Sequence, residues 1–100
     1  MAQETTAKPT RLEQWDHFDK QVRKHIPEYT EVQYGNKEGD EQADNFTIEE
    51  CWKHIDRYRN RSSSSVRGPK EKLRDAIKVA HYAQFIYDKL RIALDEPDVY

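Results

Sequence analysis

Positively charged side chains recur at helical spacing around the stretch RNRSSSSVRGPKEKLR, Arg59–Arg74. Arg57 and Arg61 lie one helical turn apart and share a helix face. A second series follows at steps of four, four and three residues: Lys70, Arg74, Lys78 and His81. Guanidinium and ammonium groups bind phosphate oxygens through charge and hydrogen bonds. The pattern predicts a site for a phosphorylated ligand, either nucleic acid or a nucleotide. The candidate ligand-binding residues are Arg57, Arg61, Arg67, Lys70, Arg74, Lys78 and His81.

The loop between the two basic series supports this hypothesis and also a simpler one. Serine hydroxyls, and backbone amides near Gly68, would donate further hydrogen bonds to an anion. Serine runs are also typical of flexible connectors, and charged helix faces are usually only solvated. Tyr58, Tyr82 and Phe85 lie near the basic residues and would suit base stacking, although such aromatics are more often core. Both interpretations stay open at this point.

Charge is strongly separated along the chain although the net charge is only −2. Residues Arg57–Arg74 carry seven basic side chains against Glu71, and residues Glu28–Glu50 carry eight acidic side chains against Lys37. Opposite poles of this kind orient partners, or bind the opposite pole of a second copy. Together with the small size of the chain, they favour a homo-oligomer.

No pattern in the sequence indicates catalysis, a metal site or a cofactor. Cys51 is the sole cysteine, and the four histidines follow no metal-ligand spacing. Two pairs of carboxylates could hold magnesium, as in all-α nucleotide pyrophosphohydrolases: Glu49 with Glu50, and Glu71 with Asp75. The second pair is better explained by pairing with nearby lysines and arginines. We therefore expect no enzyme activity, and no bound metal.

Three helices would position these residues. Thr10 and Glu13 have the spacing of a capping box, and apolar residues then recur until Pro27. Thr47 and Glu50 repeat this signal for a helix reaching about Arg61, with an apolar stripe of Ile48, Cys51 or Trp52, Ile55 and Tyr58. Gly68 and Pro69 begin a third helix, running from about Lys70 to Leu94. Trp15 and Trp52 are core candidates.

The third helix is predicted to be central, with the other two packed on it. Its apolar residues cover a broad arc, and its alanines allow close approach: Ala76, Val79, Ala80, Ala83, Ile86, Tyr87, Leu90 and Leu94. Between the first two helices lies an acidic, irregular connector, residues 28–46, whose order the sequence does not decide. The fold class is therefore all-α, a three-helix domain.

Domain organisation and location follow from length and composition. We predict a flexible tail over residues 1–9, and a single helical domain over residues 10–96. The N-terminal segment has no apolar core typical of a signal peptide, and no apolar run has the length of a membrane span. These features predict a cytoplasmic protein with no membrane partner.

Residues Thr47–Leu90 resemble small phage and prophage proteins of unknown function, including the SaV-like phage family. The resemblance lies in a helix ending in Tyr58 and Arg61, a basic loop at Arg67-Gly68, and a second helix running from Glu71 to Tyr82. The Gly-Asn-x-x-Lys-Tyr core usual in that family is replaced by Cys-Trp-Lys-His-Ile-Asp at Cys51–Asp56. The resemblance implies a phage-encoded accessory protein in a host cytoplasm, which binds a host factor or a small nucleotide.

Three functions therefore remain in view. The first is a non-enzymatic binding protein for a phosphorylated ligand. The second is an interaction module that inhibits or recruits a host protein, and the third is a metal-dependent nucleotide hydrolase. Salt-dependent oligonucleotide binding would favour the first, because phosphate contacts release counterions.

Overall fold

The chain folds into helices with no strand among the residues that the structure, a computed structural model, describes: 7–28, 44–64 and 66–100. Within these ranges the helices are α2 (Arg11–Pro27), α4 (Ile48–Ser62) and α5 (Pro69–Leu94). The prediction of an all-α fold with a long C-terminal helix is confirmed. Most of the acidic connector, and most of the N-terminal tail, lie outside the described residues.

Local signals set the helix ends. In α2 and α4 both halves of a capping box form: the Thr10 and Thr47 hydroxyls accept from the amides of Glu13 and Glu50, whose carboxylates accept from the threonine amides. Helix α5 begins with Pro69, which suits a first turn, and ends where Asp95 adopts a left-handed conformation (φ 55°). The sequence prediction of the three helix boundaries was therefore close.

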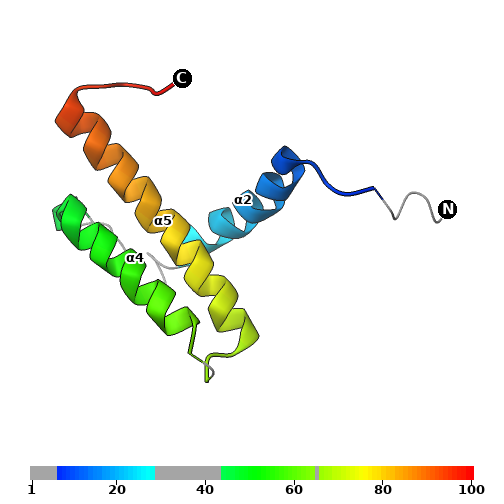
Figure 1. The fold of residues 1–100 in the computed structure, drawn as a ribbon. Coiled ribbons are helices and arrows are strands. Elements are labelled where there is room, and N and C mark those ends of the chain that lie inside the picture. Colours follow the sequence, from blue (N-terminus) through cyan, green and yellow to red (C-terminus); the bar gives the residue numbers. More distant parts are fainter. Residues whose placement is uncertain (1–6, 29–43, 65) are drawn as a thin grey trace.

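Helices α4 and α5 form an antiparallel hairpin that contains the core (Figure 1). The buried apolar side chains are Cys51 and Tyr58 from α4, and Tyr82 and Ile86 from α5. Five partly buried residues pack against them: Phe46, Ile48, Ile55, Val79 and Phe85. This small cluster supplies the hydrophobic stabilisation that joins the two helices.

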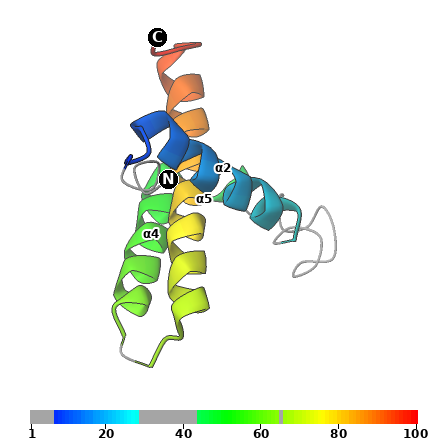
Figure 2. The ribbon, with the colours of Figure 1, turned by 90° about the vertical axis from the view of Figure 1, so that its right-hand side faces the viewer.

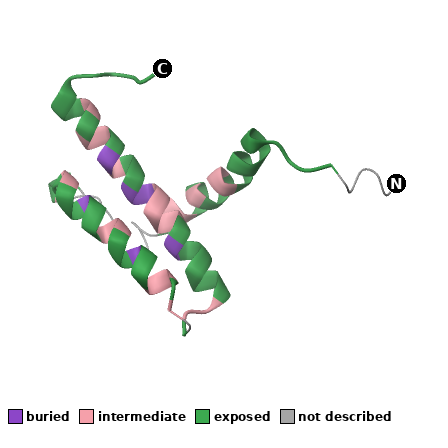
Figure 3. Cartoon of the chain, in the orientation of Figure 1, coloured by how far each residue is buried: buried purple, intermediate pink, exposed green. Residues whose placement is uncertain are grey.

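Helix α2 packs on α5 as predicted, but only loosely. Figures 1 and 2 show α2 crossing α5, with its C-terminal turns beside α5 and its N-terminal half directed away from the hairpin. No residue of α2 is buried (Figure 3). Helix α5 is therefore central, because it contacts both other helices. Helix α4 shares the buried core with it, whereas α2 adds no buried residue.

The prediction that Trp15 and Trp52 belong to the core is wrong. Their side chains are 56% and 50% exposed. Cys51, Ile55 and Tyr58 face α5, and Trp52 lies about 100° further round α4, which carries it away from the interface. Trp15 instead contacts Phe18 edge-to-face (ring centroids 5.4 Å apart) on the half of α2 that leaves the hairpin.

Candidate functional site

The predicted basic residues do not act as one set, because Asp75 engages two of them. Asp75 is 1% exposed, and its Oδ1 accepts from Arg61 Nη2 at 2.8 Å and from Arg67 Nη2 at 2.9 Å. Arg67 Nε also donates to Oδ2 at 3.3 Å. Burial alone would raise the pKa of Asp75, but the hydrogen bonds and charges of the two arginines outweigh it, and the pKa is lowered. Arg61 and Arg67 therefore close the α4–α5 hairpin.

Ser63 and Ser64 form hydrogen bonds with backbone groups close to this ion pair. The Ser64 amide donates to the Arg61 carbonyl at 3.1 Å, and the Arg67 amide donates to the Ser64 carbonyl at 3.2 Å. Ser63 Oγ donates to the Asn60 carbonyl at 2.8 Å, which satisfies one of the last carbonyls of α4. Ser63 and Ser64 thus make contacts with the local backbone.

Other members of the basic set gather around the ring of Tyr58. Arg57, Arg61 and Lys78 place their charged groups 5.3, 4.9 and 5.5 Å from its centroid. Cation–π contact of this kind is favourable and does not neutralise the charge. Tyr58 itself is buried, so its ring is not available for stacking on a base.

The remaining predicted residues lie in different environments. Lys70 is exposed in the first turn of α5, and His81 is buried, with its ring 4.4 Å from that of Phe85 and 6.5 Å from that of His25. His81 is therefore an internal packing residue beneath α2. Tyr82 is likewise buried, as the core interpretation of these aromatics expected.

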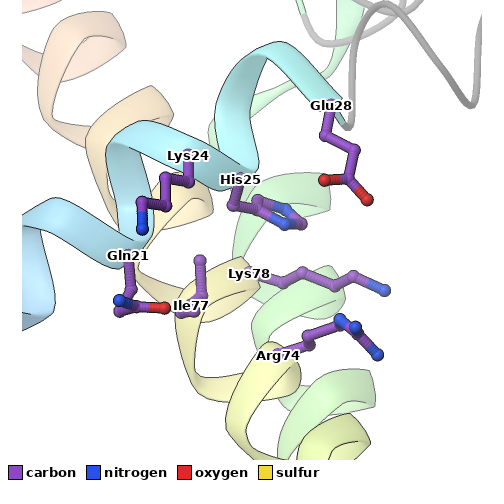
Figure 4. Close-up of a pocket in the computed structure, with 7 residues that line it drawn as sticks. All are labelled: Gln21, Lys24, His25, Glu28, Arg74, Ile77 and Lys78. Atoms are coloured by element: carbon purple, nitrogen blue, oxygen red, sulfur yellow. The ribbon is translucent and has the colours of Figure 1, made fainter.

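Arg74 and Lys78 enter a cleft that the sequence did not reveal. It lies between α2 and α5, has a volume of about 500 Å³, and is seen in close-up in Figure 4. Helix α5 contributes Arg74, Ile77 and Lys78, and α2 with the residue after it contributes Gln21, Lys24, His25 and Glu28. The basic last turn of α2, Lys24 and His25, was the one sequence signal that could have indicated it.

Positive charge in this cleft is only partly balanced. Burial lowers the pKa of Lys78, and the charges of Arg61 and Arg67 lower it further, against the opposite effects of Tyr58 and Asp75. Burial also lowers the pKa of His25, as do Lys78 and Arg74, whereas Glu28 raises it. Within the described ranges no carboxylate lies at ion-pair distance from Lys78, and Arg74 has only a long contact of 3.9 Å with Glu71. The cleft is thus electrostatically suited to an anion.

The carboxylates considered for magnesium have other contacts. The Glu50 carboxylate accepts from the Thr47 amide at 2.8 Å, Glu71 faces Arg74, and Asp75 binds the two arginines. In the part of the chain that the structure describes, no group of three histidine, cysteine or acidic residues is placed to hold a metal ion. Over the same residues, no helix has the length and apolar character needed to cross a bilayer.

No known protein family, curated protein or solved structure matches the chain.

Proposed function

We propose that this protein is a non-catalytic, phage-type accessory binding protein that holds a phosphorylated ligand in the cleft between α2 and α5. The observation that carries the proposal is the burial of Lys78 and the charge of its neighbours. Its ammonium group is partly buried among other cations, and no carboxylate in the described residues pairs with it. The charge of Asp75 offsets this only in part, since burial and the two arginines outweigh it, and a bound anion would relieve the remaining cost of the partly buried charge.

The neighbouring groups suit phosphate in particular. Arg74 extends in the same direction as Lys78, Lys24 adds a cation from α2 on the side of Gln21, and His25 becomes a fourth cation when protonated (Figure 4). Gln21 offers a neutral amide donor at the rim. A volume of about 500 Å³ falls within the range of small-molecule sites, and exceeds what one phosphate needs. The ligand is therefore a phosphodiester of nucleic acid or the phosphate of a nucleotide.

Fluorescence anisotropy of a labelled oligonucleotide tests this function. We expect binding at low salt that weakens steeply at moderate salt, because phosphate contacts release counterions. Charge reversal by Arg74→Glu with Lys78→Glu should weaken binding roughly tenfold or more, and lower the salt slope by about 1–2. Free nucleotides added as competitors then separate a nucleotide site from a nucleic-acid site.

A matched control separates the cleft from overall charge. Arg11→Glu with Arg59→Glu changes the net charge equally, but both residues are exposed and lie outside the cleft. This control should retain binding. Equal loss in both double variants, or no binding at low salt, would overturn the proposal. Arg67 is unsuitable for the experiment, because its loss would leave the buried Asp75 without one of its two partners.

The second candidate function, an interaction module for a host protein, draws on the exposed apolar side of α2. Leu12 and Trp15 lie on the half that leaves the hairpin, and neither is buried. A partner captured from bacterial lysate that stays bound after nuclease treatment and at high salt would favour this function. Magnesium-dependent turnover of nucleoside triphosphates that is lost on changing Glu50 or Glu71 would instead favour the hydrolase.

A further inference from the structure

Helix α5 carries a third face, which neither α4 nor α2 covers. Its apolar residues recur at strictly alternating steps of three and four over three heptads. They are Leu73, Ala76, Ala80, Ala83, Tyr87, Leu90 and Leu94, and we refer to them as the α5 seam. Such a 3.5-residue period keeps an apolar stripe facing one partner helix along its whole length.

The seam is open to solvent although it is apolar. Leu73 and Leu94 at its two ends are 67% and 66% exposed. Ala76, Ala83, Tyr87 and Leu90 are also exposed, and Ala80 is half-buried. Figure 3 shows exposed positions alternating with buried ones along α5. Contiguous apolar surface of this extent usually marks an interaction site.

The two neighbouring helices use other faces of α5. Helix α4 packs over Asp75, Tyr82 and Ile86, and α2 packs over the cleft residues Ile77 and Lys78. On a helix that advances about 100° per residue, the seam lies roughly opposite Lys78. A further helix can therefore reach the seam without displacing the core of the hairpin.

Side-chain size divides the seam into two halves. The first half has alanine at three successive positions, 76, 80 and 83, and the second has the large residues Tyr87, Leu90 and Leu94. Beside the first half, an apolar groove of about 490 Å³ runs between α4 and α5, with Ile55, Ala76 and Val79 in its lining. The first half is thus shaped to receive large side chains, and the second half presents them.

We propose that the α5 seam binds the α5 seam of a second copy, in antiparallel orientation about a two-fold axis. In this register Leu94 lies opposite Ala76 of the second copy, Leu90 opposite Ala80, and Tyr87 opposite Ala83. Each of these layers then joins a large and a small side chain, which fills space at even helix separation, and Leu73 lies opposite the segment that follows α5 in the second copy. The interface is isologous, as in most homodimers.

Charge supports the same orientation. The start of α5 carries the exposed lysines Lys70 and Lys72, and the segment after its end is acidic, with Asp95, Glu96 and Asp98. The antiparallel register brings the basic start of each copy to the acidic end of the other. A parallel pair would place like charges together, and would join alanine to alanine at one end and Tyr87 to Tyr87 at the other.

Sedimentation equilibrium of the full chain without ligand tests the proposal. We expect a reversible dimer with a dissociation constant in the roughly micromolar range, because a single helix pair buries less than a standard-size interface. Ala83→Glu, which places a carboxylate against Tyr87 of the second copy, should abolish the dimer. Ala83 is exposed, so circular dichroism should show an unchanged fold.

Ile92→Glu is the matched control. Ile92 is an exposed apolar residue of the same helix but lies away from the seam, so this variant should dimerise normally. A chain that stays monomeric up to several hundred micromolar, or a dimer that Ala83→Glu leaves intact, overturns the proposal. The first result would leave the seam to a partner of another kind.

Cysteine cross-linking tests the orientation independently. Mixing a chain carrying Ala76→Cys with one carrying Leu94→Cys should give the mixed disulfide on oxidation, because these positions face each other. Cys51 is fully buried and should not take part. Efficient Ala76→Cys homodimers without the mixed product would refute the antiparallel arrangement. Neither experiment uses a ligand, so the outcome is independent of the phosphate-binding function.

Discussion

Replacing Asp75 by asparagine removes a buried charge that joins both ends of the α4–α5 turn. The asparagine side chain keeps the size and one oxygen acceptor, but lacks the negative charge that pairs with Arg61 at 2.8 Å and Arg67 at 2.9 Å. The guanidinium groups of Arg61, which lies over Tyr58, and of Arg67 would then lose their shared counter-charge. We expect Asp75→Asn to be strongly destabilising.

The structure sets the size of this effect. Removing one partner of a fully buried ion pair costs about 3–5 kcal/mol. Here the side chains of Arg61 and Arg67 stay 37% and 22% exposed, so water screens part of their repulsion. We therefore expect the free energy of unfolding to fall by about 2–3 kcal/mol, a large share of the total for a domain of this size.

Urea denaturation followed by circular dichroism measures this change. For a small domain the expected loss lowers the urea midpoint by about 1–2 M. Asp88→Asn is the control, because Asp88 pairs with Arg91 at 3.5 Å on a half-exposed surface, where such a pair contributes less than about 0.5 kcal/mol. A midpoint for Asp75→Asn as close to wild type as that of Asp88→Asn would refute the reasoning.

The pH dependence provides a second check on Asp75. Because its folded pKa lies below the unfolded value of about 3.9, its contribution to stability is complete above that pH and is lost as the pH falls through the folded pKa. The difference in unfolding free energy between wild type and Asp75→Asn should thus be constant near neutral pH and shrink in strong acid. A difference that instead appears only above neutral pH would assign the effect to another group.

Two further predictions concern the caps and the cleft. Thr47→Ala should lower the free energy of unfolding by about 1 kcal/mol. Thr10→Ala should have a smaller effect, because α2 buries no residue. Equal shifts in the urea midpoint of the two variants would contradict the loose packing of α2. In the free protein, burial and the charge of Lys78 lower the pKa of His25. A phosphate in the cleft favours the protonated form of His25. The affinity for an oligonucleotide should therefore rise as the pH falls below about 6.5. Affinity that is flat from about pH 8 to about pH 5.5, or that rises equally in His25→Gln, would place the ligand elsewhere.

The helices were predictable because their signals are local. The capping boxes at Thr10 and Thr47, and the Gly68-Pro69 pair, act on backbone groups within one turn, so the sequence around them is sufficient. The separation of charge was equally readable from composition. Which side of α4 faces α5 was less predictable, because the neighbours Cys51 and Trp52 both fit the apolar stripe. In the structure Cys51 is buried and Trp52 is exposed.

The candidate site could be predicted only in part. Arg74 and Lys78 were expected to bind phosphate, and both line the cleft, but their companions Lys24 and His25 come from a helix some fifty residues earlier. Arg61 and Arg67 are also basic and come from the same part of the sequence as Arg74 and Lys78. They pair with the buried Asp75, however, and so stabilise the α4–α5 hairpin. Which arginine meets a carboxylate depends on distances across the hairpin, and spacing along one helix carries no information about those.

The helix boundaries, the all-α class and the separated charges thus follow from local sequence, because hydrogen bonds within a turn and formal charges do not depend on distant residues. The tertiary structure alone decided which residues are buried, which cations are neutralised by Asp75, which line the cleft, and which face of α5 remains open. Those properties depend on the angle and rotation at which α2 and α4 meet α5. That geometry results from the packing of all three helices together.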